Sequence, residues 1–435
     1  MNTGNKIYDL CNRLFPICRS ITGNGNRKTL EIIKELIPIN INEISTGTNI
    51  FDWIIPKEWN INDAYVENFL GEKVIDFKKN NLHVVNYSSP INKIMSKEEL
   101  LEHIHSDPDY PEAIPYVTSY YEKRWGFCIA DVDRKSLIGD VFNAVIDSSI
   151  DDGSLTYADL IIPGREKKEI LISTYICHPS MANNECSGPS LATYLSLDLL
   201  KSNNRYTYRF VFAPETIGAI AYISQNFNLL KNNVVHALNL TCVGDNKNYS
   251  FMATRLGNTT TDKIARHVLK YYTDNHIEYP FTERGSDERQ YCHPSVNIPM
   301  ISLMRSKYGT YKEYHTSKDD MSFVSSDGFA GSYNINKKCI NAFESNYVYS
   351  QSFLCEPMLM KRNLVPKDWI MRRTSSKKCE KNEFIKRTMN VLFQVDGIND
   401  LIDISNNLDI NYETCIESID VLIEQKIINK HDVIE

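Results

Sequence analysis

Four short segments of the chain combine acids, histidines and small polar residues that could carry out chemistry. Two of them contain the histidines His178 and His315, and a third contains an isolated acid, Glu215. Zinc in hydrolases takes about three protein ligands from His, Asp and Glu and leaves a position for water. A nearby carboxylate can then act as general base on that water. The residue types therefore favour a hydrolytic metal site, and the four segments are 178–188, 213–218, 284–291 and 312–320.

The elements that must position these segments alternate between strand-like and helix-like patterns. Strands are expected at 170–174, 207–212, 234–241 and 298–304, with helices at 190–200, 219–230 and 259–274. Strands separated by helical crossovers predict an α/β sheet with a largely parallel centre. Ligands of such sheets bind beyond the carboxyl ends of the strands. His178, Glu215 and Asp245 each follow such an end, so we expect them to converge.

In these segments the sequence resembles the co-catalytic zinc aminopeptidase family, which also includes the glutaminyl cyclases. It is most similar to a bacterial aminopeptidase-like branch with an inserted N-terminal module and a C-terminal winged helix. The resemblance covers essentially the whole chain and implies a mixed α/β sheet flanked by helices. The motifs that carry it are ICHPSMANNECSGP, APETIG, RGSDERQY and YHTSKDD.

The resemblance also implies roles for individual residues. His178 matches the first metal histidine of the family, His315 the last metal histidine, and Glu215 the general base. The aspartate that bridges two metals in the family falls on Asn184, an amide that cannot bridge two cations well. Glu185 is one position along, and its longer side chain could compensate.

Other positions depart from the family pattern. The second glutamate of the family pair is Thr216, and an expected aspartate is Thr241, with Asp245 as a possible substitute. The supporting acid expected two residues after the first histidine is Ser180. These departures favour one zinc ion over two, although two ions stay open as an alternative. The preferred ligands are His178, Glu185 and His315.

The segment 284–291 is expected to bind substrate. Arg289 could hold a substrate carboxylate in its planar fork, and Asp287 could orient a ligand or bind metal. A structural ion pair among Asp287, Glu288 and Arg289 is the alternative. A mixed zinc site is a further alternative, although the spacing of its residues matches no structural zinc pattern; it would use Cys177, Cys186, Cys292 and His293.

The length of 435 residues exceeds what one ordinary core covers, so two or three domains are expected. A zinc-peptidase-like α/β domain is predicted from 1–47 and 141–355. Short β-rich runs and aromatic stretches predict an inserted β-rich module at 48–140. Three short helical patterns predict a winged helix-turn-helix module at 380–435.

The charge balance bears on partners. The chain has a net charge of −7, and residues 380–435 hold 12 acids against 5 Lys or Arg, so no nucleic-acid partner is expected. The C-terminal module is expected to mediate homo-oligomer formation or to bind a protein partner. No apolar run approaches the roughly 20 residues of a membrane helix, and the N-terminus lacks the apolar core of a signal peptide. A cytoplasmic protein with no membrane partner is expected, and the 11 scattered cysteines fit reduced thiols.

Together these patterns predict a metal-dependent hydrolase that cleaves an amide bond in a peptide or small amide, most like an aminopeptidase. Glu215 would activate the zinc-bound water. One alternative is a non-catalytic binding or scaffold descendant, which Thr216 and Thr241 favour. Another is an amidase or acyltransferase that acts on an amidated sugar or other small molecule.

Overall fold

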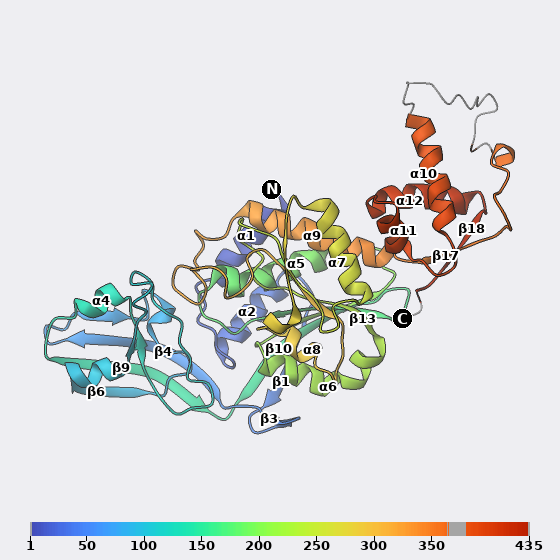
Figure 1. Cartoon of the computed structure of the whole chain (residues 1–435). Coiled ribbons are helices and arrows are strands. Elements are labelled where there is room, and N and C mark those ends of the chain that lie inside the picture. The colour runs from blue at the N-terminus through green and yellow to red at the C-terminus, as the bar shows by residue number, and fades with distance from the viewer. Residues whose placement is uncertain (1, 363, 365–379, 434–435) are drawn as a thin grey trace. The chain divides into compact units, whose positions relative to one another are not determined.

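The computed structural model describes residues 2–362, 364 and 380–433 (Figure 1). The chain divides into two compact units. The first unit comprises Met1–Thr261 and Asn275–Asn336, and the second comprises Asp262–Asp274 and Lys337–Glu435. The predicted site residues all belong to the first unit.

An eight-stranded mixed sheet forms the centre of the first unit. Its order is β1-β10-β12-β11-β13-β16-β14-β15, and its middle strands β12, β11, β13 and β16 run parallel. Every residue of β11 and β13 is buried, as expected of central parallel strands covered on both faces. The predicted mixed α/β fold is confirmed. The strands are β1 (Asn40–Ser45), β10 (Ser154–Ile162), β11 (Glu169–Tyr175), β12 (Thr207–Ala213), β13 (Val234–Asn239), β14 (Ser250–Met252), β15 (Ile277–Tyr279) and β16 (Met300–Met304).

The strand order reverses its direction at β11. The chain passes from β11 through α5 (Ser187–Leu199) to β12 on one side, then through α6 (Ile217–Asn233) to β13 on the other side. Because such crossovers are right-handed, the two helices cover opposite faces of the sheet, as Figure 1 shows. This reversal of direction is where open α/β sheets bind ligands. The first unit also contains α1 (Thr3–Leu14), α2 (Asn24–Lys34), α8 (Glu288–Tyr291) and the first part of α9 (Ser326–Ser345).

A second sheet lies between β1 and β10 in the chain. It is antiparallel, with the order β5-β4-β9-β6, and it has its own apolar core around Phe127 and Phe142. The predicted domain boundaries stay a prediction. The elements are β4 (Glu58–Asn68), β5 (Lys73–Asp76), β6 (Ile91–Ser96), α3 (Lys97–Glu102), α4 (Asp131–Lys135) and β9 (Val141–Asp151), with the small pairs β2 (Asn49–Ile50) with β3 (Trp53–Ile54) and β7 (Ile104–His105) with β8 (Phe127–Cys128).

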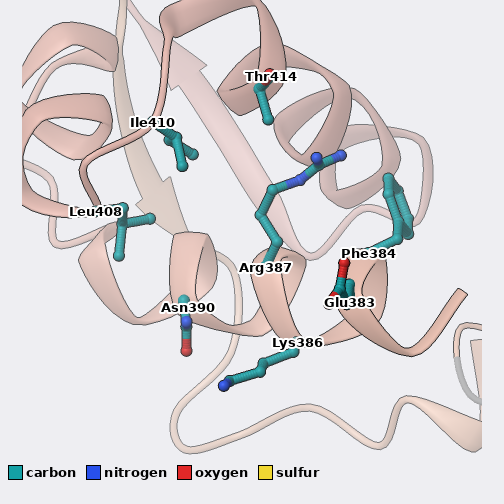
Figure 2. A pocket seen from close by; sticks show the side chains of 8 residues that line it. All are labelled: Glu383, Phe384, Lys386, Arg387, Asn390, Leu408, Ile410 and Thr414. Atoms are coloured by element: carbon teal, nitrogen blue, oxygen red, sulfur yellow. The ribbon is translucent and has the colours of Figure 1, made fainter. Parts of the chain in front are cut away.

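The second unit contains the predicted winged helix. Three helices are followed by β18 (Ile428–His431), which pairs antiparallel with β17 (Val348–Gln351). The helices are α10 (Glu380–Gln394), α11 (Leu401–Asn407) and α12 (Tyr412–Glu424). Figure 2 shows a pocket of about 640 Å³ in this unit, between α10 and the turn that precedes α12. The lining mixes charged and apolar side chains and is remote in sequence from the predicted site residues. The residues that line the pocket are Glu383, Phe384, Lys386, Arg387, Asn390, Leu408, Ile410 and Thr414.

The start of α12 is bound by residues of its own unit. His267, on α7 (Thr260–Tyr272), accepts a hydrogen bond at Nε2 from the Tyr412 backbone N–H at 3.0 Å. Glu413 pairs with Lys338 Nζ at 2.7 Å and accepts a hydrogen bond from the Tyr272 hydroxyl at 2.9 Å. In helix-turn-helix proteins the corresponding helix enters the DNA major groove with its N-terminal residues. Here those residues already have protein partners.

We predict that the full chain will not shift duplex DNA in a mobility assay at physiological salt. The acidic balance of residues 380–435 makes the counterion-release contribution unfavourable. In addition, Tyr412 and Glu413 would have to leave their partners before they could reach a base. Tight binding that weakens steeply as salt is added would contradict both arguments.

The lengths and compositions of the helices bear on membranes. α9 (Ser326–Ser345) has 20 residues, but charged and amide side chains interrupt its apolar positions. Within the described residues, no helix is long and apolar enough to cross a membrane.

Candidate metal and catalytic site

The chain turns sharply after β11, and this turn carries the first predicted ligand. His178 is the third residue after the strand and is 5% exposed. Ser180 has a positive φ of 39°, and a π-helical turn, Ala182–Cys186, then leads directly into α5. Such turns are rare and frequently occur at functional sites. The motif ICHPSMANNECSGP therefore forms an unusual connection that is buried along its whole length.

The imidazole of His178 lies between two carboxylates. Its Nδ1 is 2.8 Å from Glu185 Oε2, and its Nε2 is 3.7 Å from Glu215 Oε2. The thiol of Cys177 is also close to Nδ1, at 3.4 Å. Glu185 and Glu215 are thus brought to the same ring, although they face different nitrogens.

Glu185 is fully enclosed, and Arg19 lies beside it. The two side chains are each 1% exposed, with Arg19 Nε 3.6 Å from Glu185 Oε1. Burial raises the pKa of Glu185, whereas the Arg19 guanidinium lowers it. Arg19 also donates to the His178 carbonyl at 2.9 Å and to the Leu14 carbonyl at 2.7 Å. Arg19 could not be predicted as a site residue, because no local pattern marks a single arginine between α1 and α2 as buried.

His315 lies next to His178 despite their separation in the chain. The two ring centroids are 5.4 Å apart, and the ring of Tyr116 is 5.2 Å from each of them. His315 Nε2 is buried and has no hydrogen-bond partner. Burial, and then the neighbouring His178, lowers the pKa of His315 to about 3. The imidazole is therefore neutral and has a lone pair available to a cation. Tyr116, whose ring lies beside both imidazoles, was not predicted as a site residue.

Glu215 is positioned by the end of β12 and the start of α6. Its backbone N–H donates to Cys177 Sγ at 3.2 Å, which joins the ends of β12 and β11. Burial raises the pKa of the Glu215 carboxyl, whereas His178 and Arg289 lower it. The next residue, Thr216, has φ 63° and ψ −76°. Positive φ is strained for a β-branched residue and occurs where the surroundings enforce it.

The residues predicted to bind substrate contact Thr216. Asp287 Oδ1 accepts the Thr216 backbone N–H at 2.7 Å, and the Arg289 guanidinium donates to the Thr216 hydroxyl. Asp287 is buried, and its Oδ2 has no partner. Burial, and then the nearby Glu215, raises the pKa of Asp287 well above its ordinary value. Glu288 instead accepts hydrogen bonds from the Gly285 and Ser286 backbone and from Tyr308, which is a structural arrangement. A role for Asp287 and Arg289 in substrate binding stays a prediction.

Two aspartates hold the π-helical turn. Asp319 accepts the backbone N–H groups of Asn183 at 2.6 Å and Asn184 at 2.9 Å. Asp245 accepts from the Asn183 side chain and from the Ser306 N–H and hydroxyl. Both Asp245 oxygens therefore already have protein donors. Asp245 was predicted as a possible substitute ligand, whereas no separate role was predicted for Asp319.

The donor atoms at this site fit a divalent cation. Among the described residues, one group of three His, Cys, Asp or Glu has ligand atoms that all lie within 4.8 Å of one another. It consists of Cys177, His178 and Glu185, and His315 is not part of it. His315 Nε2 is buried without a hydrogen-bond partner, whereas buried polar atoms normally have one. Glu185 Oε1 also accepts no hydrogen bond, although Arg19 Nε lies 3.6 Å away. Nitrogen, sulfur and carboxylate oxygen are the donors that zinc takes in proteins.

Family comparisons agree with this architecture. A family model described as a domain of unknown function, DUF4910, matches residues 8–346. The chain belongs to the DUF4910 family. A winged helix-turn-helix model matches residues 347–430 of this DUF4910 chain. The predicted C-terminal winged helix is thus confirmed.

Relatives of the DUF4910 chain include a Clostridium acetobutylicum protein named as a candidate polysaccharide biosynthesis protein with an aminopeptidase-like domain. It is 48% identical over 363 residues, which is 83% of each chain. A crystal structure of a candidate peptidase from Clostridium acetobutylicum matches with a TM-score of 0.92 and 42% identity, and covers 98% of this chain and 96% of that one. The zinc aminopeptidase BSAP of Bacillus subtilis has a TM-score of 0.56 at 12% identity, covering 78% and 94%. The predicted zinc-aminopeptidase-like fold is confirmed.

Proposed function

We propose that this DUF4910 protein is a metal-dependent hydrolase that cleaves an amide bond, with Glu215 as the general base. The observation that carries the proposal is the 3.7 Å approach of Glu215 Oε2 to Nε2 of His178, at the carboxyl end of the central strands. Peptidase-type hydrolases share the fold, which supports the reaction class. A non-catalytic descendant would also have this fold. The Glu215 carboxylate beside His178 is therefore the feature that favours an enzyme.

A zinc ion at this site would be held by the imidazoles of His178 and His315. The Glu185 carboxylate, which faces Nδ1 of His178, would be either a third ligand or the group that orients the ring. When bound, zinc polarises a carbonyl group and lowers the pKa of its water toward about 7.

The residues of the chain supply the remaining steps. The Glu215 carboxylate would take a proton from the attacking water and return it to the leaving amine. A pKa raised by burial suits this role, because a general base works best with a pKa near the working pH. Arg289 and Asp287 flank the same strand end and would bind the polar end of a peptide or small amide.

A second candidate substrate is an amidated sugar. The name of the Clostridium acetobutylicum relative refers to polysaccharide biosynthesis, and that relative is similar over most of this chain. The proposed chemistry is the same for a sugar amide and a peptide, because both present a carbonyl and a leaving amine. A comparison of turnover on aminoacyl anilides and N-acetylated sugars distinguishes the two.

The test of the proposal is the metal content of protein purified without chelator. We expect about one zinc ion per chain by elemental analysis. His178→Ala should lose the ion, whereas His293→Ala should keep it, because His293 is exposed and lies outside the donor group. Wild-type protein that holds no metal, or His178→Ala protein that retains it, would end the proposal. Loss of metal in His293→Ala would instead favour the mixed Cys/His site.

A further inference from the structure

The two nitrogens of His178 face different surroundings, and an imidazole bound to one cation uses only one of them. We propose that a cation binds Nε2 of His178, and that Glu185, held by Arg19, accepts a hydrogen bond from Nδ1 and orients the ring. Glu185 is then a positioning residue instead of a ligand. This inference rests on the proposed metal-dependent function and adds which atoms of this chain face the metal.

Distances separate the two sides of the ring. Two ligand atoms on a tetrahedral zinc ion with bonds of about 2.1 Å lie about 3.4 Å apart. The 2.8 Å between Nδ1 and Glu185 Oε2 is shorter than this and falls within the range of an N–H···O hydrogen bond. The 3.7 Å between Nε2 and Glu215 Oε2 is too long for a hydrogen bond, so Nε2 is free to bind a cation. The geometry at Nδ1 is therefore that of a hydrogen bond, and the open side is Nε2.

The charges favour the same assignment. The Arg19 guanidinium lies 3.6 Å from Glu185 Oε1, with both side chains almost completely buried, so this carboxylate already has a cationic partner. A divalent cation on the Nδ1 side would be placed close to that guanidinium, where repulsion is strong because screening by water is weak. On the other side, Nε2 faces the Glu215 carboxylate. His315, whose Nε2 has no partner, is the neighbouring ring.

The arrangement has a general chemical rationale. Histidines that bind metals almost always donate their other ring N–H to a carboxylate, carbonyl or water, which fixes the tautomer and the ring orientation. The acid expected two residues after the first histidine is Ser180 in this chain, and Ser180 donates to the Phe15 carbonyl instead. Glu185 reaches the same imidazole from the π-helical turn. Cys177 lies on the Nδ1 side as well, so this assignment removes it from the ligand set.

The experiment is a nuclear magnetic resonance measurement on protein that carries ¹⁵N-labelled histidine and is loaded with ¹¹³Cd²⁺. The signals of His178 are assigned by their disappearance in His178→Gln. We expect cadmium–nitrogen coupling at Nε2 of His178 and a retained proton on Nδ1. Glu185→Gln should keep the Nε2 coupling, since the amide oxygen can still accept the N–H, and should weaken cadmium binding about 10–100-fold.

Glu166→Gln is the matched control, because Glu166 also pairs with a buried arginine, Arg205, at 2.7 Å but is not part of the donor group. It should bind cadmium as the wild type does. Coupling at Nδ1, a thiolate-type cadmium shift that Cys177→Ser removes, or abolished binding in Glu185→Gln would overturn the inference and leave a metal-dependent function standing. Wild-type protein that binds neither cadmium nor zinc would overturn both.

Discussion

Replacing Glu215 by Gln is expected to lower turnover of an amide substrate by about 10²–10⁴-fold, while the protein keeps its fold and its metal. Gln is nearly isosteric with Glu but cannot take a proton from water. The metal should stay, because His178 and His315 provide the imidazole donors and Glu215 is assigned to proton transfer. Turnover of aminoacyl anilides or N-acetylated sugars, zinc content and melting temperature should be measured on the same preparation.

The comparison variant is His178→Ala, which should lose metal and activity together. A Glu215→Gln protein with wild-type turnover would end the general-base assignment. Release of the metal by Glu215→Gln would mean that Glu215 has taken the ligand position that Thr216 leaves vacant in the family pattern. A lower melting temperature with no selective loss of turnover would instead assign Glu215 to a structural network around Arg289.

Replacing Arg19 by Met is expected to lower the free energy of unfolding by about 3–5 kcal/mol, as breaking a buried ion pair does. The substitution leaves the Glu185 carboxyl buried without its cation and removes the donor to the His178 and Leu14 carbonyls. Urea denaturation followed by fluorescence or circular dichroism measures the change. Arg13→Met is the control: Arg13 pairs with Glu35 on the surface, where such pairs contribute about 0–1 kcal/mol.

The double variant Arg19→Met with Glu185→Gln separates charge from packing. Because it removes both members of the pair, it should be less destabilised than Arg19→Met alone. It also provides a folded protein for measurement if the single variant does not fold. Equal unfolding free energies for Arg19→Met and Arg13→Met would show that the buried pair does not stabilise this site.

Much of the fold could be predicted because its signals are local. The apolar residues from Ile170 to Ile172 follow the charged stretch 165–169, so a buried strand at this place follows from the sequence. The start of α12 also has a local signal, because Asn411 caps the helix by accepting the Thr414 N–H. Alternating strands and helices then fix which strand ends meet, which is why His178 and Glu215 could be expected to converge.

The rest of the site could not be predicted, because it depends on contacts between distant segments. Arg19 reaches Glu185 from the loop after α1, and Tyr116 reaches His178 and His315 from the stretch between β7 and β8. Neither residue type is unusual in its local sequence. The spacing of His178 and Glu185 is also compatible with shared coordination or with a hydrogen bond. Only the three-dimensional arrangement distinguishes which nitrogen of the ring the carboxylate faces.

The backbone at Thr216 has a consequence for how this protein can evolve. A β-branched residue at φ 63° costs on the order of 1–3 kcal/mol, which a glycine would largely avoid. Selection for heat resistance alone would therefore favour Thr216→Gly, since that change removes the cost. The same change would remove the hydroxyl that accepts a hydrogen bond from Arg289, and it would make the backbone beside Glu215 less rigid. A threonine that is kept at this position would thus reflect selection for activity and not for stability, as expected where the two oppose each other.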